Sequence, residues 1–127
     1  MSINKAQKRI LVVDDEDHIR NILMRTLIAE GYDVTGASSG AEAVSRVEDE
    51  TFDVLISDVR MPGMDGLETV RAIKARQPDI IAVMASGVSE EEIAQADAIA
   101  AGAIAYFTKP YTLDELLTTL EEVLRGE

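Results

Sequence analysis

The feature of this chain that most constrains its fold is a fivefold alternation between short apolar runs and helical patterns. Each apolar run has the length of one strand, and the segment after it repeats apolar residues at three- and four-residue spacing. This alternation predicts a parallel sheet with helices on both faces, joined by right-handed crossovers. The expected fold class is therefore α/β, with one five-stranded parallel sheet.

The expected elements follow from this pattern. Strands are expected at 9–13, 32–37, 54–56, 80–84 and 104–107. Helices are expected at 18–30, 41–49, 66–76 and 89–101, and a last helix opens at Asp114 and Glu115. The second strand is polar enough to lie at or near a sheet edge. The alanine-rich fourth helix has little apolar area to bury, so we expect it to be the least firmly docked.

Helix boundaries carry their own signals. One serine of the Ser38–Ser39 pair is expected to cap the second helix, and Ser89 is expected to cap the fourth. The first helix has apolar residues at helical spacing, which predicts one apolar stripe. These residues are Ile19, Ile22, Leu23 and Leu27.

Composition limits the classes of function. Apolar residues make up 46% of the 127 residues, enough for one core, so we expect a single domain over 1–127 with its core at about 9–124. The formal net charge of -12 disfavours direct binding to nucleic acid or to an anionic membrane. The chain has no cysteine, which excludes thiolate chemistry. No apolar run has the length of a membrane span or a signal-peptide core, so a cytoplasmic protein is expected.

Polar side chains follow four of the five expected strands at the point where each strand ends. Because the carboxyl ends of parallel strands meet at one edge of the sheet, we expect these side chains to gather into one site. They are Asp14 and Asp15 after the first strand, Asp58 after the third, Ser86 after the fourth and Lys109 after the fifth.

A second interpretation exists for the acidic run after the first strand. Asp15, Glu16 and Asp17 could cap the following helix and complement its dipole. That role suits Asp17 well and Glu16 plausibly, but it does not require Asp14 and Asp15.

The types of side chain indicate phosphoryl transfer. Three carboxylates within a few ångströms of each other need a cation to remain ionised, and oxygen ligands favour a hard ion such as Mg²⁺. Lys109 offers a compact positive charge to an anionic ligand, and Ser86 offers a hydroxyl donor. Asp58 is the best-placed nucleophile and would form an aspartyl phosphate.

The motifs VVDDE, SDVRMPGMDG and FTKP, in this order, resemble the receiver domain of bacterial two-component response regulators, as in CheY-like proteins. The resemblance covers the chain from about residue 9 to residue 124. It implies a flavodoxin-like (βα)5 fold. It also implies a signalling phosphoacceptor, which catalyses only its own phosphoryl transfer and slow dephosphorylation and is not otherwise an enzyme.

The resemblance assigns the phosphoryl and metal ligands. It implies that Asp58 takes a phosphoryl group from the phosphohistidine of a sensor histidine kinase or a histidine phosphotransfer protein. Asp15, Asp58 and the backbone carbonyl of Arg60 would bind Mg²⁺, with Mn²⁺ as an alternative ion, and Asp14 would help through water. Lys109 would contact the phosphoryl oxygens.

The resemblance also implies a switch. Ser86 occupies the position of the family's switch Thr or Ser, and Tyr106 that of its rotating aromatic residue. The peptide bond between Lys109 and Pro110 would be cis. Phosphorylation would then change the surface of the fourth helix, fifth strand and fifth helix, which controls a partner and offers a face for homodimerisation. An ordinary loop serine and a half-buried structural tyrosine remain the alternatives for Ser86 and Tyr106.

Three rival classes of protein fit parts of this pattern. A metal-dependent phosphatase or mutase would commonly place a second Asp two residues after the nucleophile, where this chain has Arg60. A flavodoxin would need a Ser/Thr/Gly-rich phosphate loop where this chain has Asp14 and Asp15. A phosphorylation-independent module would not need the whole set of polar residues.

The last expected helix ends a few residues before the end of the sequence, so we expect no output domain within this chain. A single-domain regulator, a phosphorelay carrier and a receiver cut from a longer protein, with its output domain tethered there, remain alternatives.

Overall fold

The computed structural model describes residues 4–59, 61, 63–86, 97–108 and 112–126, without the side chains of Ser86 and Thr108. The elements in chain order are the 3-10 helix η1 (Lys5–Gln7), β1 (Arg9–Val13), α1 (Asp17–Ala29), β2 (Asp33–Ala37), α2 (Gly40–Asp49), β3 (Val54–Asp58), α3 (Gly66–Arg76), β4 (Ile81–Ser86), β5 (Ala103–Thr108) and α5 (Leu113–Leu124). Residues 97–101, between β4 and β5, are also helical.

The strands form one parallel five-stranded sheet with the order β2-β1-β3-β4-β5. The α/β prediction is confirmed, β2 lies at an edge as expected, and β3 is the central strand. β1 and β3 are almost wholly buried, which explains why they read as unbroken apolar runs. β4 runs two residues beyond the predicted end at Met84, so that Ser86 is its last residue.

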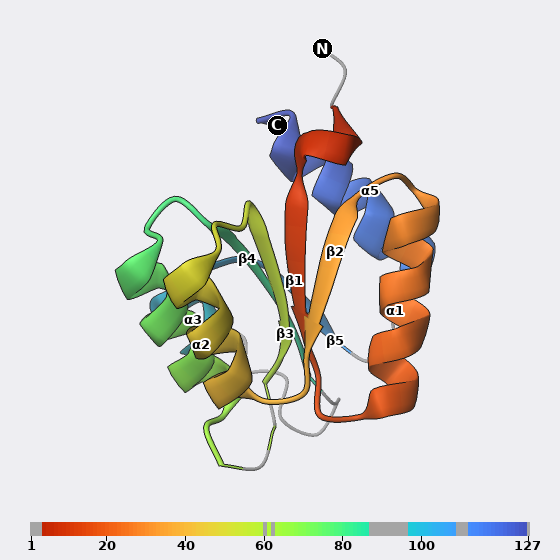
Figure 1. Cartoon of the computed structure of the whole chain (residues 1–127). Helices are drawn as coiled ribbons and strands as arrows, with labels where there is room; N and C mark the ends of the chain where they lie inside the picture. Colours follow the sequence, from red (N-terminus) through yellow and green to blue (C-terminus); the bar gives the residue numbers. More distant parts are fainter. Residues whose placement is uncertain (1–3, 60, 62, 87–96, 109–111, 127) are drawn as a thin grey trace.

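Helices cover both faces of the sheet (Figure 1). α2 and α3 lie on one face, and α1 and α5 lie on the other. The first face buries Val47 of α2 and Ile73 of α3 in one apolar cluster, and the second buries Leu27 of α1 and Leu120 of α5 in another. All carboxyl ends of the strands point to the same edge of the sheet, which we call the carboxyl edge.

Side-chain caps set the starts of three helices. Ser39 caps α2 by accepting a hydrogen bond from the Glu42 N–H at 3.1 Å, as predicted for one of the two serines. Asp65 caps α3 and Thr112 caps α5 in the same way. The predicted cap at Ser89 lies outside the described residues.

The apolar stripe of α1 is narrower than its sequence pattern indicated. Leu23 and Leu27 are buried, but Ile19 and Ile22 are 37% and 41% exposed. α1 lies over the edge of the sheet formed by β1 and β2, so only one row of its side chains reaches the core.

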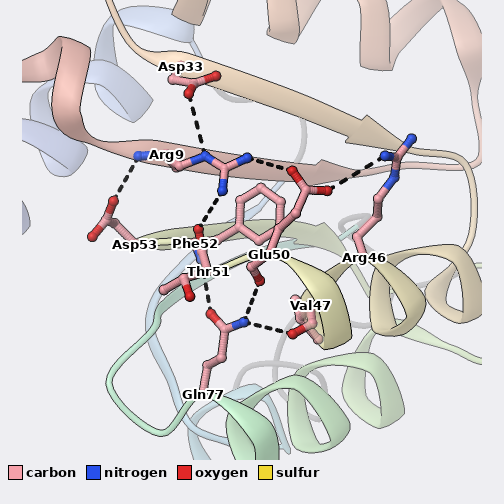
Figure 2. A network of polar contacts seen from close by, with 9 residues as sticks. All are labelled: Arg9, Asp33, Arg46, Val47, Glu50, Thr51, Phe52, Asp53 and Gln77. Atoms are coloured by element: carbon pink, nitrogen blue, oxygen red, sulfur yellow. Dashed lines mark hydrogen bonds and ion pairs between the residues drawn. The ribbon is translucent and has the colours of Figure 1, made fainter.

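A polar network holds the edge of the sheet where the strands begin, opposite the carboxyl edge (Figure 2). We call this edge the amino edge. Arg9 Nη2 lies 2.6 Å from Glu50 Oε1, and Arg9 also reaches Asp33 and the Thr51 carbonyl. The Gln77 side chain accepts from the Phe52 N–H at 3.0 Å and donates to the Val47 and Glu50 carbonyls. These contacts tie the ends of α2 and α3 to the starts of β1 and β3.

Candidate functional site

The sheet brings the ends of β1 and β3 together at the carboxyl edge. β1 pairs with β3 in parallel, with Val13 opposite Ser57. Asp14 directly follows β1 and Asp58 is the last residue of β3, so the two carboxylates leave neighbouring strands side by side. Asp14 is only 6% exposed, and Asp58 is partly buried.

A third carboxylate joins them. One carboxylate oxygen from each of Asp14, Glu16 and Asp58 lies within 4.8 Å of the other two. We call these residues the carboxylate cluster. The predicted ligand Asp15 is exposed and does not belong to this cluster. The sequence offers Glu16 as a helix cap, and it does hold the N-cap position of α1, but its side chain makes no capping hydrogen bond.

The turn that carries two of these carboxylates is held by short hydrogen bonds. The Asp14 N–H donates to the Ala37 carbonyl at 3.2 Å, which fixes the turn to the end of β2. The Glu16 N–H donates to Asp14 Oδ1 at 2.9 Å. Arg20 of α1 donates from Nη1 to the Asp14 carbonyl and from Nη2 to Asp17 Oδ1, both at 2.7 Å. Sequence reasoning missed Arg20, although an Arg three residues after an Asp at a helix start is a readable pairing signal.

The loop after Asp58 is fixed by the start of α3. The Gly66 N–H donates to the Val59 carbonyl at 2.8 Å, and a Cβ added at Gly66 would overlap the carbonyl oxygen of Asp58. The Val59 N–H donates to the Ala85 carbonyl of β4 at 2.9 Å. These contacts fix the backbone directly after Asp58, so its carboxylate is presented from a rigid support.

The other predicted site residues are only partly described. Ser86 ends β4 opposite Thr108 of β5, which places its backbone at the carboxyl edge. The side chain of Ser86 lies outside the description, and so do Arg60, Lys109 and Pro110 in full, including the predicted cis peptide bond.

Tyr106 lies on β5 opposite Met84 of β4. Its ring is partly buried and packs against the apolar cluster on the α2 and α3 face. Its hydroxyl oxygen is buried and has no hydrogen-bond partner within the part of the chain that the structure describes.

The donor set of the carboxylate cluster suits a hard divalent cation. All three side chains offer oxygen atoms, and no histidine belongs to the group. Mg²⁺ prefers such ligands and keeps several waters, which leaves room for phosphate oxygens. Like charges at this spacing repel each other, and a cation would relieve that repulsion. The residues therefore fit Mg²⁺.

None of the described helices has both the length and the apolar content needed to cross a membrane.

Known proteins have sequences similar to that of this chain. The sequence profile of the response regulator receiver domain matches residues 10–121. The transcriptional regulatory protein ZraR of Escherichia coli K12 is 41% identical over 115 residues, which are 91% of this chain and 26% of that protein. The response regulator MprA of Mycobacterium avium is 40% identical over 119 residues, which are 92% of this chain and 51% of that protein.

Solved structures agree with the sequence matches. A CheY-like receiver domain protein of Methanospirillum hungatei has a TM-score of 0.88 at 31% identity, covering 94% of each chain. The chemotaxis protein CheY4 of Vibrio cholerae has a TM-score of 0.84 at 34% identity, covering 91% of this chain and 98% of its own. This chain spans about a quarter of the length of ZraR. The chain belongs to the response regulator receiver domain family of two-component signalling.

Proposed function

We propose that this chain is a phosphoacceptor in which Asp58 takes a phosphoryl group from a phosphohistidine in a Mg²⁺-dependent reaction. One observation carries the proposal: Asp58 ends the central strand with the carboxylates of Asp14 and Glu16 gathered beside it. A buried support and a clustered negative charge are what a cation-assisted phosphoryl site requires. Family membership supports the same reaction.

The proposed transfer forms one bond at Asp58 and breaks one bond in the donor. A carboxylate oxygen of Asp58 attacks phosphorus and forms a P–O bond, while the P–N bond of the phosphohistidine breaks. The bonding electron pair leaves with the imidazole of the donor. Bound Mg²⁺ supplies charge neutralisation for the phosphoryl oxygens and the carboxylates. The fixed backbone around Asp58 keeps its oxygen in line for the attack.

Further residues complete the proposed site. By the family resemblance, Asp15, Asp58 and the Arg60 carbonyl are proposed as Mg²⁺ ligands, with Asp14 acting through water and Mn²⁺ as an alternative ion. Glu16 is added as a candidate ligand, because its carboxylate lies in the carboxylate cluster. Lys109 is proposed to contact the phosphoryl oxygens, and the Ser86 hydroxyl to move towards one of them. Tyr106 is proposed to respond to Ser86.

The proposed partners follow from the reaction. The donor would be a sensor histidine kinase or a histidine phosphotransfer protein. ZraR is named a transcriptional regulatory protein and is about four times as long as the matched segment, so an output partner or tethered output domain is proposed here. The surface formed by the helix that contains residues 97–101, together with β5 and α5, would carry the signal, with phosphorylation-linked homodimerisation as one mode.

Intact-protein mass after incubation with acetyl phosphate tests the proposal. With Mg²⁺, the wild type should gain one acid-labile phosphoryl group, and Asp58→Asn or chelation of the metal should abolish the gain. Asp53→Asn is the matched control, because Asp53 begins the same segment but accepts the Arg9 N–H at 2.8 Å at the amino edge. It should be phosphorylated like the wild type.

Two results would contradict the proposal. One is phosphoryl uptake that survives in Asp58→Asn. The other is no uptake by the wild type from either acetyl phosphate or a phosphohistidine donor, which would favour a phosphorylation-independent interaction module.

A further inference from the structure

Arg20 makes contacts that the proposed phosphoryl transfer does not itself use. Its guanidinium donates to the Asp14 carbonyl and to Asp17 Oδ1, both at 2.7 Å. One contact therefore holds the end of β1 and the other holds the first residue of α1. Between these two points lie Asp15 and Glu16, so the guanidinium spans the whole acidic turn 14–17. A planar fork that reaches two acceptors fixes geometry better than a single contact does.

The fold makes room for this side chain. Arg20 is only 16% exposed, whereas its partner Asp17 is 79% exposed. Gly36 of β2 lies beneath it: a Cβ added there would lie 3.4 Å from Arg20 Cδ and closer still to Met24. The absence of a side chain at Gly36 lets the stem of Arg20 lie down against the edge strand. The position of the guanidinium is therefore set by packing as well as by charge.

Arg20 contacts one residue of the carboxylate cluster, Asp14. Asp14, whose carbonyl Arg20 holds, contributes its carboxylate to the cluster, and its Oδ1 accepts the Glu16 N–H at 2.9 Å. The Glu16 carbonyl in turn accepts the Arg20 N–H at 2.9 Å. The Arg20 side chain itself holds the backbone at Asp14, so the loss of that contact would loosen the turn that carries two of the three clustered carboxylates.

We propose that Arg20 is a positioning residue for the metal site, which holds the acidic turn 14–17 in the shape that presents its carboxylates to a divalent cation. The inference rests on the proposed function, because it concerns the same Mg²⁺ site. Residues that orient metal ligands without touching the metal commonly change metal affinity by about 10-fold or more when replaced.

The sign of the effect separates positioning from simple electrostatics. Arg20 is a cation beside a cation site, so its charge alone repels Mg²⁺. If charge were its only influence, Arg20→Met would bind Mg²⁺ more tightly than the wild type. If Arg20 positions the turn, the same substitution weakens Mg²⁺ binding despite the removal of a positive charge.

Isothermal titration calorimetry with Mg²⁺ alone, on the unphosphorylated protein, provides the test. We expect Arg20→Met to raise the Mg²⁺ dissociation constant by about 10-fold. Arg20→Lys keeps the charge but reaches only one acceptor, so its Mg²⁺ dissociation constant should lie between those of the wild type and Arg20→Met. Arg25→Met is the matched control: Arg25 is exposed on the same helix, and its removal should change the dissociation constant less than about 2-fold.

A metal-free measurement guards against loss of folding. Hydrogen exchange at the Glu16 amide should speed up in Arg20→Met, while exchange in β3 should stay as in the wild type. If Arg20→Met does not fold, Asp17→Ala removes one acceptor of the fork, whereas Asp17→Asn keeps an oxygen that can accept from Arg20. Both variants lose the same charge, so Asp17→Ala should weaken Mg²⁺ binding more than Asp17→Asn does.

The outcomes separate the two proposals. Wild-type Mg²⁺ binding with unchanged or tighter binding by Arg20→Met would overturn the inference about Arg20 and leave the proposed function intact. No Mg²⁺ binding by the wild type would overturn the proposed function and this inference together.

Discussion

The two edges of the one sheet treat charge in opposite ways. At the amino edge, carboxylates meet guanidinium groups and backbone donors, as in the contacts of Arg9 with Glu50 and Asp33 (Figure 2). At the carboxyl edge, the carboxylates of Asp14, Glu16 and Asp58 converge on each other. The same strands link both edges, so the difference does not come from the fold class. It comes from which side chains the sequence puts at the strand starts and at the strand ends.

The two edges have different roles in the molecule. Opposite charges and satisfied amides at the amino edge stabilise the folded state, and nothing further is needed to complete them. Like charges clustered at the carboxyl edge repel each other, and a divalent cation bound there would relieve that repulsion.

Adding a side chain at Gly66, which lies close to the backbone of Asp58, should have the largest effect on stability. We expect Gly66→Ala to lower the free energy of unfolding by about 3 kcal/mol, because the added Cβ overlaps the Asp58 carbonyl oxygen. Gly63→Ala is the control in the same loop: Gly63 has a φ of 76° but open space around it, so only about 1 kcal/mol of backbone strain is expected. Urea denaturation of both variants measures the difference, and equal losses would contradict the tight support of Asp58.

Breaking the amino edge should be the next largest effect. Gln77→Leu leaves the Phe52 N–H and the Val47 and Glu50 carbonyls without their side-chain partner. We expect a loss of about 2 kcal/mol in the free energy of unfolding. Mg²⁺ affinity, measured by calorimetry, should stay at the wild-type value because the carboxyl edge is untouched. A coupled loss of Mg²⁺ affinity would show that the two edges are not independent.

Removing a carboxylate from the carboxyl edge should lower Mg²⁺ affinity and leave the stability of the metal-free protein intact. Asp14→Asn keeps the size of the side chain but removes one negative charge from the carboxylate cluster. We expect Mg²⁺ affinity to fall by about 10-fold. Unfolding in the absence of metal should need about the same urea concentration, because an Asn side chain keeps the oxygen that accepts the Glu16 N–H. Clear destabilisation of the metal-free protein would contradict this view of the cluster.

The smallest predicted effect is a pH dependence at the amino edge. The hydrogen bond from Arg9 lowers the pKa of Glu50 from its ordinary value of 4.5. The pair therefore stabilises the fold fully above the unfolded pKa, and this contribution is lost as pH falls through the lower folded pKa. The difference in urea midpoint between the wild type and Glu50→Gln should shrink between about pH 7 and pH 3.5. A difference that stays constant over this range would contradict the assignment.

Much of the fold and part of the site could be predicted from sequence. The apolar runs that become β1 and β3 are buried on both faces, so their pattern is unambiguous. Once a parallel sheet is inferred, the residues at strand ends share one edge by geometry, and this is why Asp14 and Asp58 could be placed together. The predicted capping by one serine was confirmed at Ser39 for the same reason, since the cap is a local interaction.

The remainder depends on tertiary packing. A carboxylate before a helix is explained equally well as a cap or as a ligand, so the place of Glu16 in the cluster needed coordinates. Ile19 and Ile22 match helical spacing but stay exposed, because the position of α1 at the edge of the sheet leaves room for one buried row. Arg9 and Gln77 are isolated polar residues with no periodicity, so the amino-edge network left no sequence signal.

The central claim is that the carboxyl edge carries the phosphoacceptor and that Asp58 is that residue. The most direct test is to locate the phosphoryl group after phosphorylation with acetyl phosphate and Mg²⁺. Borohydride reduction converts an aspartyl phosphate to homoserine, which peptide mass mapping then assigns to a position. If Asp58 is the phosphoacceptor, homoserine should appear at position 58 and at no other aspartate. Homoserine at Asp14, Asp15 or Asp53, or a stable adduct on a residue other than aspartate, would contradict it.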